Sequence, residues 1–463
     1  MMIKGLKDTE LPESWQWCHA KEISQLINGD RGKNYPSRKY YVSEGIPFLS
    51  AGNIDKGKIL IDELNYISQE RYDLLNSGKL TEGDILYCLR GTLGKSAIFT
   101  GLKNGAIASS LVIIRIKPSI KIKFIHYYLD SPAGKQLIKH FDNGTAQPNL
   151  SAQSVSNYPI PLAPLPEQRA LVAKIELLFS ELDNGVANLK AAKDKLEIFR
   201  QAVMEKAFEG ELTKDSSRPK DWKQETLGNV IEKIEAGKSF RCEERPPKQD
   251  ETGILKVSAV TWGEFQEEES KTVTDESKIN PAYFVQKGDF LLSRANTLQL
   301  VGNTVIVRRI QKKLMLSDKT LRISFNSNTS DWFILYFLRS HEGRKQIEAL
   351  STGNQVSMRN IGQAKIKQIR FPCPPTKQEQ TQIVQEIETR LSVCDNAIAN
   401  IEESLLKAEA LRQSILKKAF AGKLLTGTEL QACRQEPDWE PAAKLLERIK
   451  QDKKSTPVKK NKR

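Results

Sequence analysis

The segment from Gly91 to Ser96 has the residue types of a phosphate-binding loop but not their spacing. It reads Gly91-Thr-Leu-Gly94-Lys95-Ser96. A loop that cradles nucleotide phosphates needs a further glycine five residues before Gly94, and position 89 is a leucine. We therefore predict a β-turn with a basic donor here, rather than a nucleotide site.

Histidines and cysteines offer little for metal or nucleophilic chemistry. The four histidines stand at positions 19, 126, 140 and 341, and no two of them are spaced as His-x-x-x-His. The six cysteines never occur as Cys-x-x-Cys. Zinc sites and thiol-based frameworks show such short spacings, so the sequence predicts neither, and it predicts no histidine-based catalysis.

Two motifs of DNA enzymes are incomplete or missing. Glu269-Ser-Lys271 resembles half of a nuclease active site, but it lies in an acidic run, Glu267 to Glu269, without an upstream Pro-Asp. The Asn/Asp-Pro-Pro-Tyr/Phe signature of adenine methyltransferases does not occur. The sequence therefore predicts a chain that holds no cofactor and no metal and catalyses no reaction. A stand-alone DNA-processing enzyme such as a nuclease is the alternative.

The chain contains one long segment twice. Residues 166–212 match residues 378–424 at a constant offset of 212, without a gap. The offset pairs Glu167 with Glu379, and both copies close with Lys-Ala-Phe-x-Gly-x-Leu. A repeat of this length predicts the same structural element at two places in the chain.

Apolar residues recur in each copy in alternating steps of three and four. The stripe covers residues 171–203 and 383–415, and it includes Phe199 and Leu411. This is the spacing of a coiled-coil seam. Each copy predicts a helix of about 40 residues, roughly 60 Å long. Because one stripe needs a partner stripe, we expect the two helices to pack on each other.

Prolines precede both copies, and Gly210 and Gly422 stand where a helix stop is expected. Weaker echoes lie outside the copies. They are Pro12-x-x-Trp15 with Pro219-x-x-Trp222, Gly83-Asp84 and Arg90 with Gly288-Asp289 and Arg294, and a third start at Pro437-Asp-Trp439. The whole chain therefore reads as two related halves.

The segments outside the copies have mixed α/β patterns. Strand-like runs cover residues 46–49, 85–89, 111–116, 290–292 and 305–307. Residues 123–140 and 331–350 carry helical spacing. We predict two globular mixed α+β domains, each followed by one long helix.

Length and composition favour a cytoplasmic globular protein. The chain has 463 residues, of which 39% are hydrophobic and 28% charged. No run approaches the roughly 18 apolar residues of a membrane helix, and the first ten residues lack the apolar centre of a signal peptide. We therefore expect no contact with a membrane.

The basic excess is unevenly distributed. The net charge is +14, with +5 in residues 1–163, +7 in residues 213–375 and +4 in residues 426–463. Residues 164–212 and 376–425 give −2 and 0. A polyanion bound by the two globular segments explains this division, since phosphates are met by Lys and Arg. A coiled-coil adapter that binds only proteins is a further alternative.

The pattern resembles the specificity subunit of type I restriction–modification systems over essentially the whole chain. The helix copies carry the resemblance, while the second copy departs from the family's Pro-x-x-Glu-Gln start through Lys377-Gln378. The matching motifs are Pro164-Leu-Pro-Glu167-Gln168, Lys206-Ala-Phe-Glu-Gly210-Glu-Leu212, Pro374-Pro-Thr-Lys-Gln-Glu379-Gln380 and Lys418-Ala-Phe-Ala-Gly422-Lys-Leu424.

The resemblance implies the domain order. It implies target recognition domains at 1–163 and 213–375, spacer helices at 164–212 and 376–425, and a basic C-terminal tail at 426–463. It further implies a pseudo-two-fold arrangement of the two domains, joined by a pair of long antiparallel coiled-coil helices.

The resemblance also implies partners. Each domain would read one half of a bipartite, asymmetric sequence in double-stranded DNA, and the helices would fix the spacer. Two modification subunits would methylate adenine with S-adenosylmethionine. Two restriction subunits would act as ATP-dependent motor-nucleases that require magnesium.

Polar and basic residues on the predicted loops are the candidates for DNA contact, because such side chains read base edges. Arg90 and Arg294 are the strongest, since both follow a strand that begins at the repeated Gly-Asp. The full set is Ser50, Asn53, Arg90, Thr92, Lys95, Thr145, Gln147 and Asn149 in the first domain, and Lys256, Ser258, Arg294, Asn296, Gln299, Asn354, Gln355 and Arg359 in the second.

Overall fold

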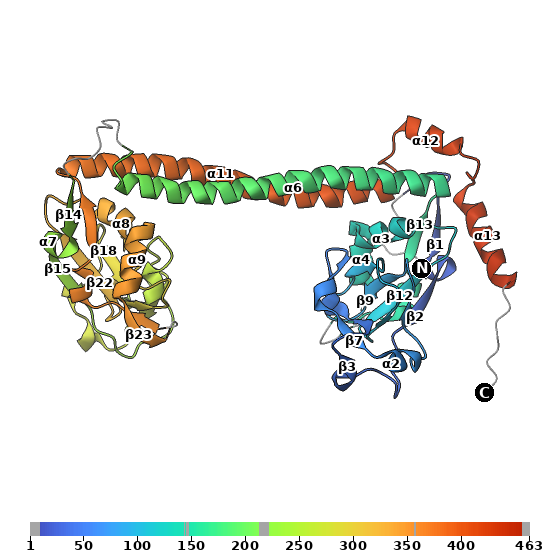
Figure 1. Ribbon diagram of the computed structural model, residues 1–463, viewed down its shortest axis with the longest axis horizontal. Coiled ribbons are helices and arrows are strands. Elements are labelled where there is room, and N and C mark those ends of the chain that lie inside the picture. Colours follow the sequence, from blue (N-terminus) through green and yellow to red (C-terminus); the bar gives the residue numbers. More distant parts are fainter. Residues whose placement is uncertain (1–9, 143, 145–147, 213–221, 356–357, 456–463) are drawn as a thin grey trace. The chain divides into compact units, whose positions relative to one another are not determined.

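The computed structural model shows a chain of two compact units (Figure 1). The first unit comprises residues 1–188 and 404–463, and the second comprises residues 189–403. Each unit holds one globular domain and parts of both long helices. The structure describes residues 10–142, 144, 148–212, 222–355 and 358–455.

A four-stranded antiparallel sheet forms the centre of the first domain. Its strands, in spatial order, are β10 (Ser96–Ile98), β9 (Ile85–Cys88), β12 (Leu111–Ile116) and β2 (Ser24–Asn28). Side chains alternate along β9, as the strand period requires. Ile85 and Tyr87 pack with the helices α3 (Ile122–Asp130) and α4 (Pro132–Phe141), whereas Leu86 and Cys88 belong to the cluster on the opposite face.

A second, five-stranded sheet supplies that opposite face. Leu49 and Ile107 pack in the same cluster as Leu86. The domain therefore has three layers: helices, a four-stranded sheet and a five-stranded sheet. The strands of the latter are β3 (Tyr41–Val42), β7 (Asn65–Ile67), β4 (Ile46–Leu49), β11 (Gly105–Ile107) and β8 (Lys79–Leu80).

The second domain repeats this plan. Phe290 and Leu292 pack towards its helices, and Leu291 packs towards the other sheet. The mixed α+β class predicted from the sequence is confirmed in both halves. The corresponding elements are the sheet β15 (Ile231–Ala236), β22 (Thr320–Phe325), β18 (Phe290–Ser293) and β20 (Thr304–Ile306), the sheet β17 (Ser270–Thr272), β16 (Thr252–Leu255) and β21 (Lys313–Met315), and the helices α8 (Asp331–Arg339) and α9 (His341–Leu350).

Short elements complete both domains. The first and last strands of each domain pair antiparallel, so the chain enters and leaves a domain side by side. These pairs are β1 (Gln16–His19) with β13 (Pro159–Leu162), and β14 (Lys223–Thr226) with β25 (Arg370–Cys373). The remaining elements are α1 (Ala20–Ile23), β5 (Ile54–Asp55), β6 (Lys58–Ile59), α2 (Gln69–Asp73), α5 (Ala152–Ser156), α7 (Leu227–Val230), β19 (Ala295–Asn296), β23 (Thr352–Gln355), β24 (Met358–Asn360) and α10 (Gln363–Ile366).

The two stretches with helical spacing, residues 123–140 and 331–350, are each broken into two helices. Ser131 and Ser340 adopt extended backbone at the breaks, and their hydroxyls accept from the amides of Gly134 and Gly343 at 3.2 Å. A Cβ on either glycine would lie within 2.2 Å of a carbonyl oxygen of the preceding helix. Serine caps and glycines therefore produce the same helix–helix corner twice.

The long helices are α6 (Leu165–Phe208) and α11 (Lys377–Phe420), each of 44 residues. Their predicted length and stop signals are confirmed. Gly210 and Gly422 have φ of +81° and +69°. The amides that follow these glycines donate back to the helix, Glu211 to the Lys206 oxygen at 2.9 Å in α6.

The two helices contact each other through the same ion pair in both units. In the first unit Arg412 of α11 pairs with Asp183 of α6, and in the second unit Arg200 of α6 pairs with Asp395 of α11. The sequence offset of 212 converts one pair into the other. The repeated sequence therefore makes one interface twice, with the roles of the helices exchanged.

The helices run antiparallel. In the second unit, Lys193 of α6 pairs with Glu402 of α11 at 2.6 Å. Arg200, seven residues later in α6, pairs with Asp395, which lies seven residues earlier in α11. Apolar side chains from both helices share the core of each unit. These are Leu171, Ile175, Ile415, Leu416 and Ala419 in the first unit, and Val203, Ala207, Ile383, Val384 and Ile387 in the second.

One part of the predicted seam is wrong. Phe199 and Leu411, which occupy equivalent positions of the repeat, are 47% and 52% exposed. The residues that follow them, Arg200 and Arg412, reach the opposite helix and form the ion pairs described above. The inward position is therefore taken by an arginine, and the apolar neighbour turns outward.

The Pro-x-x-Trp and Glu-Gln motifs fasten the start of each long helix to its domain. The Trp15 indole donates to the Glu167 carboxylate at 2.6 Å, and the Trp222 indole donates to Glu379 at 2.9 Å. Glu167 is almost fully buried, so this charge-assisted bond satisfies a group that would otherwise be costly to bury.

The glutamines of the same motif cap the domain helices. The Gln168 side-chain oxygen accepts from the amide of Lys121 at 3.0 Å, and that of Gln380 accepts from the amide of Ser330 at 2.8 Å. Lys121 and Ser330 are the N-caps of α3 and α8. The repeated Glu-Gln is thus a structural joint between a long helix and a domain.

The Lys-Ala-Phe motif fastens the end of each long helix. Phe420 packs edge-on against Phe124 and Tyr128 of α3, with ring centroids 5.2 Å apart in both pairs. Phe208 packs in the same way on Phe333 and Phe337 of α8, at 5.3 and 5.4 Å. Each domain is therefore held by the start of one long helix and the end of the other.

The segment after α11 returns to the first unit as α12 (Gly427–Arg434) and α13 (Ala442–Ser455). Leu445 and Ile449 of α13 are buried in its core. The Pro437-Asp-Trp439 motif also contacts this unit, because the Trp439 indole donates to the Glu167 carboxylate at 3.4 Å. Residues 456–463 of the predicted basic tail lie outside the described residues.

Replacing Phe420 by alanine tests the aromatic joint. Removal of a buried phenylalanine costs about 3–5 kcal/mol of unfolding free energy. Urea unfolding followed by hydrogen exchange is expected to show this loss in the first unit. Phe199→Ala, which removes an exposed phenylalanine from α6, is the matched control with an expected loss below about 1 kcal/mol. Equal losses in the two variants would contradict the assignment.

Candidate nucleic-acid interface

In the first unit, the loop after β9 contacts the segment that follows α4. Arg90 and Asn149 form an isolated antiparallel bridge, and the Arg90 Nε lies 3.4 Å from the Asn149 side-chain oxygen. We call residues 90–95 and 148–150 the first loop cluster. Arg90 and Thr92 are exposed at its surface. The structure therefore brings four predicted residues together: Arg90, Thr92, Lys95 and Asn149.

The second unit has the corresponding cluster. Strand β19, directly after Arg294, pairs with β24, which places Asn296 opposite Arg359. We call residues 294–303, 352–355 and 358–360 the second loop cluster. Arg294 and Gln299 are exposed, and among the described residues the Arg294 guanidinium has no hydrogen-bond partner. Its five N–H groups are therefore available to an external acceptor.

The Gly-Asp pairs hold the strands that lead into these clusters. The Asp84 carboxylate accepts from the Thr81 amide at 2.8 Å, and Asp289 accepts from the Gln286 amide at 2.9 Å. An arginine of the neighbouring strand, Arg115 in the first unit, pairs with this aspartate at 2.7 Å. The repeated aspartates are therefore structural, and they direct Arg90 and Arg294 to the same place in each domain.

Glycines close both clusters. Gly94 and Gly302 have φ of +77° and +74°, and a Cβ on them would meet Ile138 and Ile347 at 2.1 and 2.5 Å. Each glycine directly precedes the residue that leads into β10 or β20. The β-turn predicted at Gly94 is therefore consistent with the backbone, and the position has a counterpart in the second half.

Other predicted residues are engaged within their own loops. Asn53 is only 4% exposed; its side-chain oxygen accepts from the Ser50 amide at 2.8 Å and its amide donates to the Glu63 oxygen at 2.7 Å. The Arg359 guanidinium donates to the backbone oxygens of Gly353 and Ser351. These groups shape the loops, and a direct role in binding stays a prediction.

The remaining predicted residues have mixed surroundings. Ser258 donates to Glu269 at 2.5 Å, and Lys95 pairs with Asp55 at 3.4 Å. Lys256 is half-buried, and Gln355 is exposed. Thr145, Gln147 and the side chain of Asn354 lie outside the described residues.

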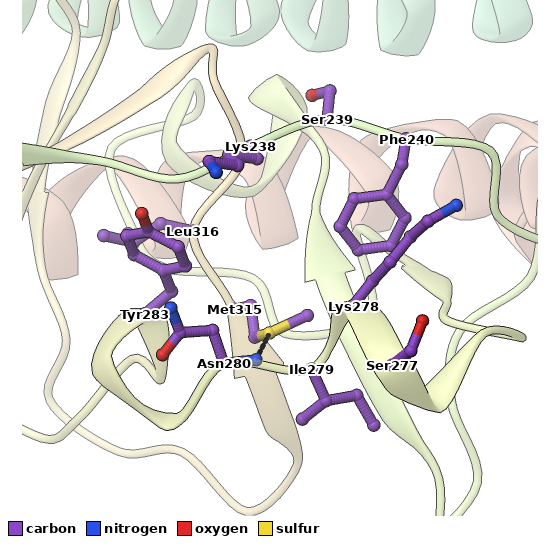
Figure 2. Close-up of a pocket in the computed structure, with 10 residues that line it drawn as sticks. All are labelled: Lys238, Ser239, Phe240, Ser277, Lys278, Ile279, Asn280, Tyr283, Met315 and Leu316. Atoms are coloured by element: carbon purple, nitrogen blue, oxygen red, sulfur yellow. Dashed lines mark hydrogen bonds between the residues drawn. The ribbon is translucent and has the colours of Figure 1, made fainter.

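The second unit also has a cavity of about 500 Å³, and none of the residues that line it belongs to the second loop cluster (Figure 2). The Lys278 ammonium lies 5.4 Å from the ring centre of Phe240, and the Asn280 amide lies 3.3 Å from the Met315 sulfur. The lining includes no carboxylate, histidine or cysteine. The hydroxyls of Ser239, Ser277 and Tyr283 therefore have no carboxylate or imidazole base beside them in this lining.

Metal-ligating side chains are dispersed over the described residues. No group of three or more His, Cys, Asp or Glu side chains in the described ranges is placed to hold a metal ion. Lys271, from the nuclease-like tripeptide, pairs with Glu244 at 2.6 Å. Within the same ranges, no helix has both the length and the apolar character to cross a membrane.

Comparison with known proteins agrees with this picture. A family model described as "Type I restriction modification DNA specificity domain" matches residues 12–197 and 219–408. The specificity subunit of the type I restriction enzyme EcoKI from Escherichia coli K12 is 26% identical over 462 residues, covering 96% of each chain.

Two solved structures share the fold. One, from work on complex assembly and conformational transition of the type I R-M system, has a TM-score of 0.69 at 20% identity, covering 90% of this chain and all of that chain. The other, the HsdS subunit from Thermoanaerobacter tengcongensis, has a TM-score of 0.57 at 18% identity, covering 90% and 99%. The packing of α6 with α11 matches this fold.

A partly buried histidine distinguishes the first domain from the second. His126 of α3 lies beneath Gly57, and its Nε2 is buried without a partner among the described residues. Burial lowers the pKa of the imidazole below its usual value. Leu335 holds the equivalent position of α8, two residues after Phe333.

His126→Leu is therefore expected to flatten the acid dependence of stability. Because the folded-state pKa is depressed, protons bind the unfolded state more strongly, and stability is lost as pH falls below about 6.5. Thermal unfolding of the wild type and the variant between pH 7.5 and 5.5 measures the difference. His140→Gln, at an exposed histidine of α4, serves as control. A variant with an unchanged pH profile would contradict the prediction.

Proposed function

Because the chain belongs to the type I restriction–modification DNA specificity family, we propose that its two domains read unlike halves of one bipartite DNA target. The chain is a DNA specificity subunit and is not itself catalytic. The observation that carries the proposal is the repeated frame with different loops. Arg90 and Arg294 follow equivalent strands, whereas the residues around them differ.

The exposed arginines suit base readout. A guanidinium presents a planar fork that binds the O6 and N7 edge of guanine in the major groove. Thr92 and Asn149 accompany Arg90, and Asn296 and Gln299 accompany Arg294. Because these companions differ in type and position, the two half-sites would differ in sequence.

The paired helices would set the spacing of the half-sites. α6 and α11 share apolar cores and repeat the same Asp–Arg pair, which supports a stiff connection. A flexible linker would leave the distance undefined. Half-sites on one face of B-DNA lie about 34 Å apart for each helical turn, so a fixed spacer needs a fixed connection of this kind.

The outward apolar residues of the helices support two copies of a modification subunit. Phe199 and Leu411 are related by the repeat and are both exposed. Two equivalent exposed apolar residues on one chain favour two equal partners. We propose that these subunits bind S-adenosylmethionine, and that two restriction subunits bind ATP and magnesium. The complex would act in the cytoplasm, on genomic DNA.

Binding of the purified chain to duplex DNA across a salt series tests the proposal. Neutralised phosphates release counterions, so log affinity should fall linearly with log salt. Failure to bind duplex DNA at any salt concentration would favour an adapter that binds only proteins. Magnesium-dependent cutting of plasmid by the pure chain would favour a nuclease.

Arg294→Ala is expected to weaken specific binding far more than non-specific binding. A bidentate contact to guanine contributes about 1–3 kcal/mol of discrimination. The measurement compares the affinity for a duplex with the target sequence, identified by mapping methylated adenines, with the affinity for a duplex whose second half-site is scrambled. Arg308→Ala, at another exposed arginine of the second unit, is the control. An equal loss on both duplexes would make Arg294 a phosphate contact.

A helical insertion tests the spacing role. Four residues inserted after Asn188 of α6 and four after Lys407 of α11 keep the antiparallel pairing and lengthen the pair by about 6 Å. The tolerated spacer should grow by about two base pairs, with both half-site sequences unchanged in the methylation pattern. Inserting the residues in α6 alone is the control, and it should disrupt the pairing. A changed half-site with an unchanged spacer would contradict the proposal that the helices set the spacing.

A further inference from the structure

A short turn lies beside the loop cluster in each unit, at equivalent positions of the two halves. It covers residues 54–59 in the first unit and residues 261–264 in the second. Both turns follow a short 3-10 helix and contain a glycine with positive φ, +79° at Gly57 and +89° at Gly263. We call each of them the flanking turn.

The loop cluster holds its flanking turn through the residue after the cluster's closing glycine. In the first unit this residue is Lys95, whose ammonium pairs with Asp55 at 3.4 Å. In the second unit it is Asn303, whose amide donates to the Thr261 backbone oxygen at 2.7 Å. The same contact position therefore joins turn and cluster in both halves.

Further bonds fix the flanking turn of the second unit on both sides of one residue. Thr261 accepts from the Asn296 side-chain amide at 3.2 Å, and the Gly263 oxygen accepts from Arg339 at 2.5 Å. The same Arg339 side chain also donates to the Thr304 backbone oxygen at 2.6 Å, so this anchor is tied to β20. Between the anchored residues stands Trp262, which is 63% exposed.

The flanking turn of the first unit has the opposite chemistry. The residue before Gly57 is Lys56, and Lys58 follows; both are exposed. In the second unit the residue before Gly263 is Trp262, and Glu264 follows. A carboxylate repels a phosphate, so the second turn is unsuited to binding the DNA backbone, whereas the first is suited to it.

We propose that Trp262 makes an apolar contact with a base edge of the second half-site, whereas Lys56 and Lys58 bind phosphates beside the first. This inference rests on the proposed DNA-reading function of the two domains. An apolar side chain distinguishes bases through contacts such as that with the thymine methyl group. A tryptophan anchored beside the Asn296 loop contributes such area with little loss of conformational freedom.

The first test compares Trp262→Ala with Trp262→Phe in the full-length chain. One duplex carries the target sequence identified by mapping methylated adenines, and the other carries the same sequence with a scrambled second half-site. For Trp262→Ala, affinity for the target should fall about tenfold, while affinity for the scrambled duplex and the salt slope stay unchanged. Trp262→Phe keeps an aromatic ring and should retain most of the affinity.

The second test uses the lysines and a chemical exchange between the turns. The double substitution of Lys56 and Lys58 by alanine should weaken both duplexes equally and reduce the salt slope by about one per lysine. Trp262→Lys should lose discrimination at the second half-site while the salt slope steepens by about one. Thermal unfolding of all variants confirms that they fold.

The outcomes separate the inference from the function beneath it. Equal losses on both duplexes for Trp262→Ala, or no loss on the target, would overturn the role of Trp262 alone. In that case the wild type would still bind DNA with a steep salt dependence. A wild type without such binding would overturn the proposed function itself, and the inference with it.

Discussion

The antiparallel packing of α6 on α11 is the interaction on which the rest of the structure depends. Each helix has one apolar stripe, and neither can bury it alone. Because the two sequences are copies, the Asp–Arg contact occurs twice with the helices exchanged, as the Asp183–Arg412 and Asp395–Arg200 pairs show. Each domain is then held by the start of one helix and the end of the other.

This arrangement separates the repeated frame from the loops that differ between the two halves. The repeated motifs, such as Glu167 with Trp15 and Phe420 with its aromatic partners, are buried and join helices to domains. The loops at Arg90 and Arg294 lie outside these joints. Their sequences can change without loss of the frame, which suits a protein whose two halves read different DNA sequences. The basic charge follows the same division, because it is concentrated in the domains and absent from the helices.

Local sequence signals predicted the elements, while contacts between distant residues needed the structure. Stripe period and glycine stops predicted both long helices, because these properties are set within a few residues. The seam prediction failed at Phe199 and Leu411, because long-range pairing places the neighbouring arginine inward. Asn53 looked available for DNA, yet a bond to Glu63, ten residues away, occupies its amide. Trp262 was missed because only the fold brings its turn to the Asn296 loop.

Mapping methylated adenines in a genome that carries this chain with its partner subunits tests the central claim most directly. Two unlike domains on a stiff helix pair predict a single motif of two different half-sites, separated by a gap of constant length. A continuous motif, two identical half-sites, or a gap that varies from site to site would contradict the account.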